Sequence, residues 1–291
     1  MKKLLVTGAS GFLGWHVCNL TRSQWQVYGT YWQRPVTLPG VAMVKVDLGD
    51  RAALQTLFDE VQPDAVLHLA ALSKPKDCQA DAELSYRINV RSSRHLAELA
   101  ATRQLPCAFT SSDLVFDGRQ PPYDEDSPVN PLSIYGEHKV LAEQAMLAAH
   151  PGVTVCRMPL MFGPAAPQAL SFVQAFAQTL RAGEPLRLFT DEYRLPVSAA
   201  TATQGLLLAL AKGSGLLHLG GRERRSRYEF GLLMAEVLDL PTATLHPCRQ
   251  EDVVLPVPRP ADLTLDSRKA FALGYDPPSS RDELVALRGQ V

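Results

Sequence analysis

Three glycines near the start of the chain constrain its fold more than any other feature. They stand in the stretch Thr7-Gly8-Ala9-Ser10-Gly11-Phe12-Leu13-Gly14, between a short apolar run and a segment with apolar residues at helical spacing. In such a unit the first glycine permits a tight turn, the second lets backbone approach a pyrophosphate, and the third lets helix and sheet pack closely. An ordinary glycine-rich turn is the alternative. The position of the glycine stretch directly after a first strand favours the other interpretation, a dinucleotide site. That site would be formed by Gly8, Ser10, Gly11, Phe12, Leu13 and Gly14.

The remaining pattern alternates between strands and helices. Strands are expected at 3–7, 26–31, 42–46, 65–71, 107–111 and 153–158, and helices at 11–22, 51–58, 81–103 and 135–149. This order predicts an α/β fold with a Rossmann-type doubly wound parallel sheet. After Pro159, helices at 169–182, 200–211 and 228–238 enclose short strands at 186–189 and 216–219. We expect an NADP-binding Rossmann domain at 1–160 and a smaller interleaved α/β lobe, mainly substrate-binding, at 161–291, with 197–220 returning to the Rossmann core.

Charge and cysteine content exclude several classes of protein. The 29 Lys and Arg residues balance 30 Asp and Glu residues, whereas a nucleic-acid surface needs an excess of cations. No apolar run approaches the ~18–20 residues of a membrane span. The five cysteines form no CxxC pair, so neither a disulfide framework nor a metal site is expected. The N-terminus resembles the head of a signal peptide, but glycines interrupt its apolar stretch. A cytoplasmic location is therefore expected.

The residues after the second expected strand bear on the choice of nicotinamide cofactor. An acidic residue there would hold a ribose 2′-hydroxyl and favour NAD. The chain instead reads Trp32-Gln33-Arg34. Arg34 offers charge to a 2′-phosphate, and Trp32 offers a ring for adenine. Arg34 as a solvated loop residue is the alternative. The sequence predicts a preference for NADP(H) over NAD(H).

A tyrosine and a lysine four residues apart carry the expected chemistry. Tyr135 and Lys139 fall on one helical face, and the lysine charge favours a phenolate whose free pKa is ~10. Ser112 ends an expected strand, where its hydroxyl can bind a substrate oxygen. Alone, the Tyr–Lys pair is typical of a helix surface. Together with the glycine turn, it indicates a catalytic site.

At this point the chain resembles the extended short-chain dehydrogenase/reductase family, from Lys3 to about Gly274. The resemblance implies that Tyr135 exchanges the carbonyl proton, that Lys139 tunes it and binds the nicotinamide ribose, and that Ser112 polarises the carbonyl. It also implies further cofactor-site residues, namely Asp47, Leu48, Leu69, Ala70, Ala71, Ser73, Asn89 and Leu160.

Within that family, several stretches resemble dTDP-4-dehydrorhamnose reductases. They are residues 111–118, Tyr123-Asp124-Glu125, Pro131, 135–143 and 259–266, with 191–196 an approximate match. The resemblance implies NADPH-dependent reduction of a 4-keto-6-deoxy nucleotide sugar, although Ser112 stands where that group usually has Thr and Leu114 where it has Tyr.

Two alternatives stay open. The chain is also similar to methionine adenosyltransferase beta subunits, which implies a non-catalytic, NADP-binding regulatory role beside a partner enzyme. A homodimer is possible in either case. The second alternative is a nucleotide-sugar epimerase, which typically retains NAD through an acidic residue after the second strand.

The remaining polar residues give weaker expectations. Asp113 is a substrate-site candidate, since related dehydratases place an Asp-Glu pair there; Leu114 in place of the Glu argues against 4,6-dehydration. Arg222, from the cluster of arginines at 222, 224, 225 and 227, and Arg259 are candidates for binding the substrate diphosphate, with a solvated face as the alternative. We expect His68 to be a hydrogen-bonded histidine of the core or site rim, and His138 to lie on the surface.

Overall fold

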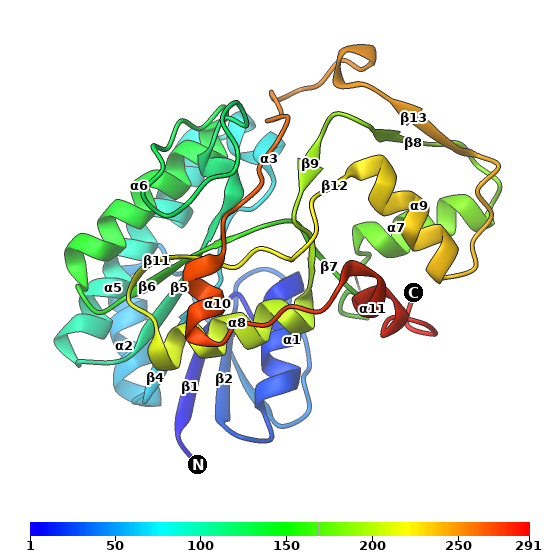
Figure 1. The fold of residues 1–291 in the computed structure, drawn as a ribbon. Helices are drawn as coiled ribbons and strands as arrows, with labels where there is room; N and C mark the ends of the chain where they lie inside the picture. The colour runs from blue at the N-terminus through cyan, green and yellow to red at the C-terminus, as the bar shows by residue number, and fades with distance from the viewer. Residues whose placement is uncertain (168) are drawn as a thin grey trace.

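A seven-stranded parallel sheet forms the centre of the molecule (Figure 1). The computed structural model describes residues 1–167 and 169–291. The strand order is β11-β6-β5-β4-β1-β2-β3, so the chain reverses its direction of winding after β3. The strands are β1 (Lys3–Thr7), β2 (Gln26–Tyr31), β3 (Val41–Lys45), β4 (Ala65–His68), β5 (Cys107–Ser112), β6 (Thr154–Met158) and β11 (Gly215–His218).

Helices cover both faces of this sheet, which is why its central strands are apolar on both sides. Leu4 and Val6 of β1 pack in one core with α1 (Phe12–Thr21) and α8 (Ala199–Lys212). Leu5, between them, points into the opposite core. That core is closed by α2 (Arg51–Val61), α5 (Ser92–Thr102) and α6 (Ile134–Ala149).

The helix expected at 81–103 is interrupted. The structure has α3 (Pro75–Ala80) and α4 (Ala82–Tyr86), then a π-helical turn η1 (Arg87–Arg91) that leads into α5. Asn89 lies in this turn and is buried, and its side-chain amide bonds both the N–H and the carbonyl of Leu72, at 2.9 and 3.1 Å. Periodicity along the helix does not reveal this tertiary contact.

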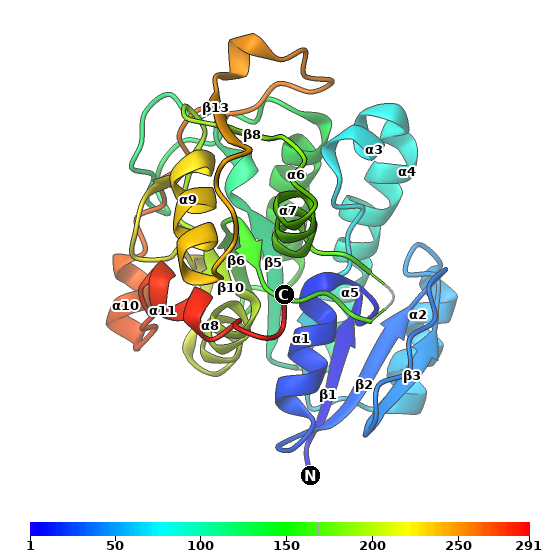
Figure 2. The same cartoon turned by 90° about the vertical axis from the view of Figure 1, so that its right-hand side faces the viewer.

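A smaller lobe follows β6. Its core joins α7 (Phe172–Arg181), α9 (Arg227–Val237) and α11 (Ser280–Val285) to the parallel pair β8 (Leu186–Phe189) and β13 (Leu245–Cys248). Figure 2 shows α7 and α9 on the same side of the molecule as α11. The other short elements are β7 (Met161–Phe162), β9 (Tyr193–Arg194), β10 (Val197–Ser198), β12 (Arg225–Ser226), the 3-10 turns η2 (Asp113–Val115) and η3 (Gln250–Asp252), and α10 (Arg268–Leu273).

The lobe and the sheet are interleaved along the chain. After β9 and β10, the chain returns through α8 to β11, which pairs with β6 at the edge of the main sheet. The expected fold class, a Rossmann-type sheet with a smaller interleaved lobe, is confirmed. Across the described residues, no helix combines the length and apolar character that a bilayer span requires.

Candidate active site

The glycine turn after β1 is shaped by two close backbone approaches. Gly8 has a φ of +71°, and a Cβ there would stand 2.8 Å from the Cα of Ala70. A Cβ at Gly14 would overlap the carbonyl oxygen of Gly8. The first glycine therefore makes the turn, and the third lets α1 pack against it.

The N-terminus of α1 suits an anion. Gly11 is its N-cap residue, and no side chain caps the first turn. By contrast, a side chain caps five of the other long helices, namely Asp50 for α2, Ser133 for α6, Ser171 for α7, Ser198 for α8 and Ser226 for α9. The long helix α5 also has no side-chain cap, but it continues directly from η1. Uncapped N–H groups at a glycine turn form a site that fits the pyrophosphate of a dinucleotide.

The segment after β4 lies against this turn. The Thr7 hydroxyl accepts hydrogen bonds from the N–H groups of Leu69 and Ala70, at 3.1 and 3.2 Å. Ala71 is half-buried, whereas Ser73 is exposed. The structure thus holds Leu69 and Ala70 beside the glycine turn. The cofactor roles of Ala71 and Ser73 stay predictions.

The residues after β2 lie open to solvent. Trp32, Gln33 and Arg34 are all exposed, and the ammonium of Lys45 lies 5.5 Å from the Trp32 ring centroid. Lys45 had no role in the sequence analysis, because the register that places β3 beside β2 is a tertiary feature.

Asp47 and Leu48 follow β3. The Asp47 carboxylate accepts from the N–H of Gly49 at 2.8 Å and pairs with Arg87 at 3.0 Å, so it is held in place from η1. Leu48 is half-buried. Leu160 lies between β6 and β7, and its carbonyl accepts from the N–H of Val197 at 3.1 Å.

Ser112, Tyr135 and Lys139 meet at the carboxyl end of β5. Ser112 ends that strand, and the other two residues lie in the first two turns of α6. All three are buried, Lys139 to 2% exposure. The Lys139 ammonium donates to the Thr110 carbonyl at 2.7 Å and lies 4.5 Å from the centroid of the Phe109 ring.

Burial dominates the proton affinities of this group. It raises the pKa of Tyr135 well above its usual range, and a hydrogen bond with the Ser112 hydroxyl offsets only part of that rise. Burial therefore outweighs any lowering of the phenol pKa by the charge of Lys139. Burial also lowers the pKa of Lys139 to about 8, partly opposed by the charge of Glu143.

Asp113 follows Ser112 and is buried. Its Oδ1 accepts from the Ser112 hydroxyl at 3.2 Å, and its Oδ2 lies 3.5 Å from Nε of Arg194. Burial raises the Asp113 pKa to about 6, against the opposing charge of Arg194. The Arg194 guanidinium also donates to the Tyr193 carbonyl at 2.7 Å. Sequence analysis assigned no role to Arg194 itself, although the residue lies in the stretch 191–196 that approximately matches the dTDP-4-dehydrorhamnose reductases.

Glu192 lies among three arginines, namely Arg194, Arg227 and Arg259. It pairs with Arg194 at 3.5 Å and with Arg259 at 3.0 Å. Burial lowers the pKa of Arg227 to about 10, and the charge of Glu192 opposes this. The Arg227 guanidinium lies over the rings of Phe172 and Phe176, at 4.8 and 5.8 Å from their centroids.

The structure does not bring Arg222 to this cluster. Its guanidinium pairs with Asp276, donates to the Pro277 carbonyl at 2.8 Å, and stacks over Phe271. Of the two diphosphate candidates, only Arg259 lies beside the Asp113–Arg194 pair.

Two histidines of the sequence analysis have different outcomes. His68 is buried and hydrogen-bonded through both ring nitrogens, to Thr7 at 2.7 Å and Ser93 at 2.9 Å, which confirms the expectation. His138 was expected on the surface, but it is only 7% exposed and its Nδ1 lies 2.8 Å from the Ser85 hydroxyl. The segment α3–α4, which was not foreseen as a cover, packs on this side of α6.

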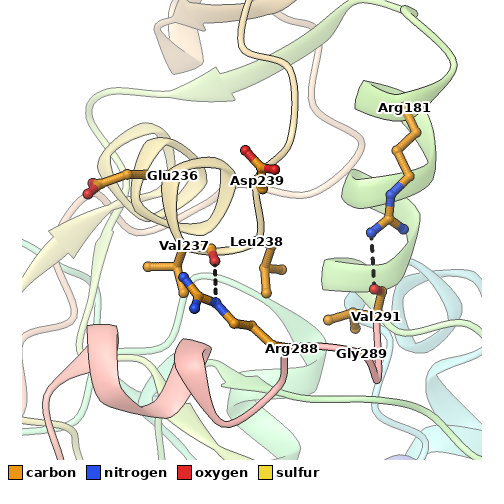
Figure 3. Close-up of a pocket in the computed structure, with 8 residues that line it drawn as sticks. All are labelled: Arg181, Glu236, Val237, Leu238, Asp239, Arg288, Gly289 and Val291. Atoms are coloured by element: carbon orange, nitrogen blue, oxygen red, sulfur yellow. Dashed lines mark hydrogen bonds between the residues drawn. The ribbon is translucent and has the colours of Figure 1, made fainter.

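A separate hollow lies in the lobe (Figure 3). Two arginines and two acidic residues line it, but both guanidinium groups are engaged by backbone carbonyls. Arg181 donates to Val291 at 3.1 Å, and Arg288 donates to Val237 at 2.9 Å. None of the catalytic candidates lines this hollow.

Comparison with known proteins places the chain among relatives that it matches over nearly its whole length. It is 32% identical over 281 residues to methionine adenosyltransferase 2 subunit beta of Xenopus laevis, covering 94% of this chain and 83% of the relative. It is 30% identical over 288 residues to a probable low-salt glycan biosynthesis reductase, Agl14, of Haloferax volcanii, covering 97% and 96%.

A solved structure is similar throughout. The hypothetical dTDP-4-dehydrorhamnose reductase of Sulfolobus tokodaii superposes with a TM-score of 0.82 at 28% identity, covering 94% of each chain. Residues 1–288 match the family described as the RmlD substrate binding domain. The chain therefore belongs to the RmlD substrate binding domain family.

Proposed function

We propose that this protein is a nicotinamide-dependent reductase that acts on the keto group of a nucleotide sugar. The observation that carries the proposal is the burial of Ser112, Tyr135 and Lys139 together at the sheet edge that also holds the glycine turn. Thr110 connects the two, since its carbonyl binds Lys139 and its hydroxyl donates to the carbonyl of His68, the residue before the 69–71 segment. Reductases named among the relatives support the same class of reaction.

We assign NADP(H) as the preferred cofactor. The uncapped N-terminus of α1 would hold its pyrophosphate. Arg34 and Lys45 lie on the neighbouring strand ends, where they would bind a 2′-phosphate, and no carboxylate follows β2 to select the 2′-hydroxyl of NAD. This absence also argues against the epimerase alternative.

The chain's own residues then handle the proton and the charge. The bound cofactor supplies a hydride. Tyr135 donates its proton to the oxygen of the reduced carbonyl. Burial raises the Tyr135 pKa and so makes the phenol a weaker acid, which the charge of Lys139 has to offset. Ser112 binds that oxygen as charge develops on it. Lys139, buried and charged below pH 8, stabilises the phenolate that remains.

The charge of the neighbouring cluster fits the substrate. Arg194, Arg227 and Arg259 provide three guanidinium groups, against the carboxylates of Asp113 and Glu192. The excess cation suits a nucleotide diphosphate. We therefore favour a 4-keto-6-deoxy nucleotide sugar, with Asp113 facing the sugar and Arg259 its diphosphate.

The experiment is NADPH oxidation, followed at 340 nm, with dTDP-4-dehydrorhamnose as substrate. Tyr135→Phe removes the proton donor while it keeps the ring, so turnover should fall at least about 100-fold with NADPH affinity unchanged. If the wild-type protein binds NADPH but turns over no keto nucleotide sugar, the reductase proposal is wrong.

The identity with the Xenopus laevis beta subunit favours a second candidate, a regulatory subunit. That protein matches along 94% of this chain, so the site geometry alone does not separate the two functions. Stable co-purification with a methionine adenosyltransferase, together with a bound cofactor that is never consumed, would support the regulatory role.

We also propose a cytoplasmic location. All five cysteines are buried free thiols, and burial raises the pKa of Cys18 to about 12. Buried thiols without disulfides are typical of a reducing compartment.

A further inference from the structure

Three buried side chains and one backbone carbonyl form a hydrogen-bonded chain beneath the candidate cofactor site. Thr7 and His68 are joined at 2.7 Å, His68 and Ser93 at 2.9 Å, and the Ser93 hydroxyl donates to the carbonyl of Asn89 at 2.7 Å. All four residues are essentially inaccessible to solvent. The chain runs from the end of β1, through the end of β4, to the π-helical turn η1.

The direction of every hydrogen bond follows from counting protons. The Thr7 oxygen accepts two N–H groups, from Leu69 and Ala70, so its own proton goes to Nδ1 of His68. The imidazole is then neutral, with its proton on Nε2, which donates to Ser93. Ser93 in turn donates to the Asn89 carbonyl. Only the neutral Nε2–H form of the imidazole satisfies every member.

Each end of this chain fixes a segment that faces the candidate cofactor site. Thr7 precedes Gly8, whose turn lies in van der Waals contact with Ala70. The same threonine holds the Leu69 and Ala70 N–H groups. At the other end, Asn89 holds Leu72 through both backbone groups. The glycine turn, residues 69–72 and η1 are therefore tied together by one imidazole.

We propose that His68 is a positioning residue for dinucleotide binding, which acts through Thr7 and Ser93 to hold the glycine turn and residues 69–72 in the geometry that receives the cofactor. The inference rests on the proposed function, because it takes that surface as the cofactor site. His68 itself contacts no substrate or cofactor atom in this scheme, since it is fully buried.

The surroundings keep the imidazole in the required form. Burial, together with the nearby charge of Lys139, lowers the His68 pKa to about 3. The Phe109 ring stacks on the imidazole with 5.3 Å between centroids, which limits its rotation. The connection is therefore independent of pH over the physiological range.

Two substitutions at His68 each keep one of the two hydrogen bonds of the imidazole and remove the other. In His68→Asn, the amide oxygen replaces the Nδ1 acceptor and keeps the bond to Thr7. In His68→Gln, the amide nitrogen replaces Nε2 and keeps the bond to Ser93. Thr7→Val keeps the side-chain shape but removes the hydroxyl, and with it the hydrogen bonds to Leu69, Ala70 and His68. NADPH dissociation constants are measured by titration calorimetry, and amide hydrogen exchange at Leu69 and Ala70 is measured in parallel.

We expect His68→Gln to weaken NADPH binding about tenfold, the effect of one lost hydrogen bond in the network, and to speed exchange at both amides. Thr7→Val removes three hydrogen bonds, to Leu69, Ala70 and His68, so it should weaken binding more than His68→Gln. His68→Asn should retain more of the affinity. The matched control is His150→Asn: His150 is also buried and uses both ring nitrogens, toward Gly152 and Leu105, but lies at the far end of α6. It should lose stability without losing affinity.

The outcomes separate the two proposals. A wild-type protein that binds no dinucleotide overturns the proposed function and this inference together. If wild type binds NADPH and all variants match its affinity, only the positioning role of His68 is wrong. The same conclusion follows if His150→Asn weakens binding as much as His68→Gln, because the effect would then be general destabilisation.

Discussion

Replacing the buried Lys139 with Met should stabilise the protein while it abolishes turnover. Burial lowers the pKa of Lys139 from 10.5 to about 8, so the folded chain binds the Lys139 proton less tightly than the unfolded chain does. At pH 7 the amine is charged in both states, and its burial destabilises the fold. At about 1.4 kcal/mol for each tenfold change in proton affinity, this costs about 3 kcal/mol of folding stability. Met removes the charge and fills a similar volume.

Two favourable contacts are lost in the same substitution. The hydrogen bond to the Thr110 carbonyl and the contact with the Phe109 ring each contribute about 1 kcal/mol. The expected net gain for Lys139→Met is therefore about 1 kcal/mol at pH 7, measured as the free energy of unfolding in urea by circular dichroism.

The pH dependence isolates the lysine more sharply. Between pH 8 and 10.5 the unfolded chain binds the Lys139 proton and the folded chain does not, so wild-type stability rises with pH through this group. Lys139→Met lacks this rise. Wild type should therefore gain about 3 kcal/mol relative to the variant over this interval, because all other groups are common to both.

Lys212→Met provides the control. Lys212 is exposed, and its ammonium also donates to a backbone carbonyl, that of Leu273 at 3.4 Å. Its replacement should leave the stability difference unchanged from pH 7 to pH 10.5. If Lys139→Met behaves in the same way, the desolvation of Lys139 has been misjudged.

Three further perturbations follow from the same contacts. Arg34→Ser should weaken NADPH binding about tenfold and leave NADH binding unchanged, as titration calorimetry would show; equal losses for both would contradict a 2′-phosphate role. Gly14→Ala should lower the free energy of unfolding by roughly 1–3 kcal/mol in urea, because its Cβ would overlap the Gly8 carbonyl; an unchanged value would contradict this close packing. Arg157→Met should cost about 3–5 kcal/mol in the same assay, since it leaves the buried Glu143 carboxylate without its partner at 2.8 Å. Adding Glu143→Gln should recover part of that loss, and no recovery would argue against an unpaired charge as the cause.

Local signals in the sequence predicted the sheet and one side of the site. The glycine turn, the apolar strands and the spacing of Tyr135 and Lys139 depend on neighbouring residues, so periodicity and residue type suffice to find them. The same holds for Asp50, which caps α2: an aspartate directly before a helix is a local signal of its N-terminus.

Tertiary contacts decided the features that local patterns do not contain. Arg194 pairs with Asp113, which lies 81 residues earlier in the chain (194 − 113). The covering of His138, the π-helical turn at Asn89 and the hydrogen-bond partners of His68 depend on segments that approach only after folding. The sequence therefore predicted individual side chains of the site, but not the residues with which they form hydrogen bonds and ion pairs.

The sequence by itself determined the Rossmann-type sheet, its glycine turn and the shared helical face of Tyr135 and Lys139, because short-range sterics and hydrophobic periodicity specify them. Only the tertiary structure decided the proton affinities of those side chains. Desolvation depends on everything packed around a group, and here it raises the Tyr135 pKa that sequence spacing alone indicated would fall.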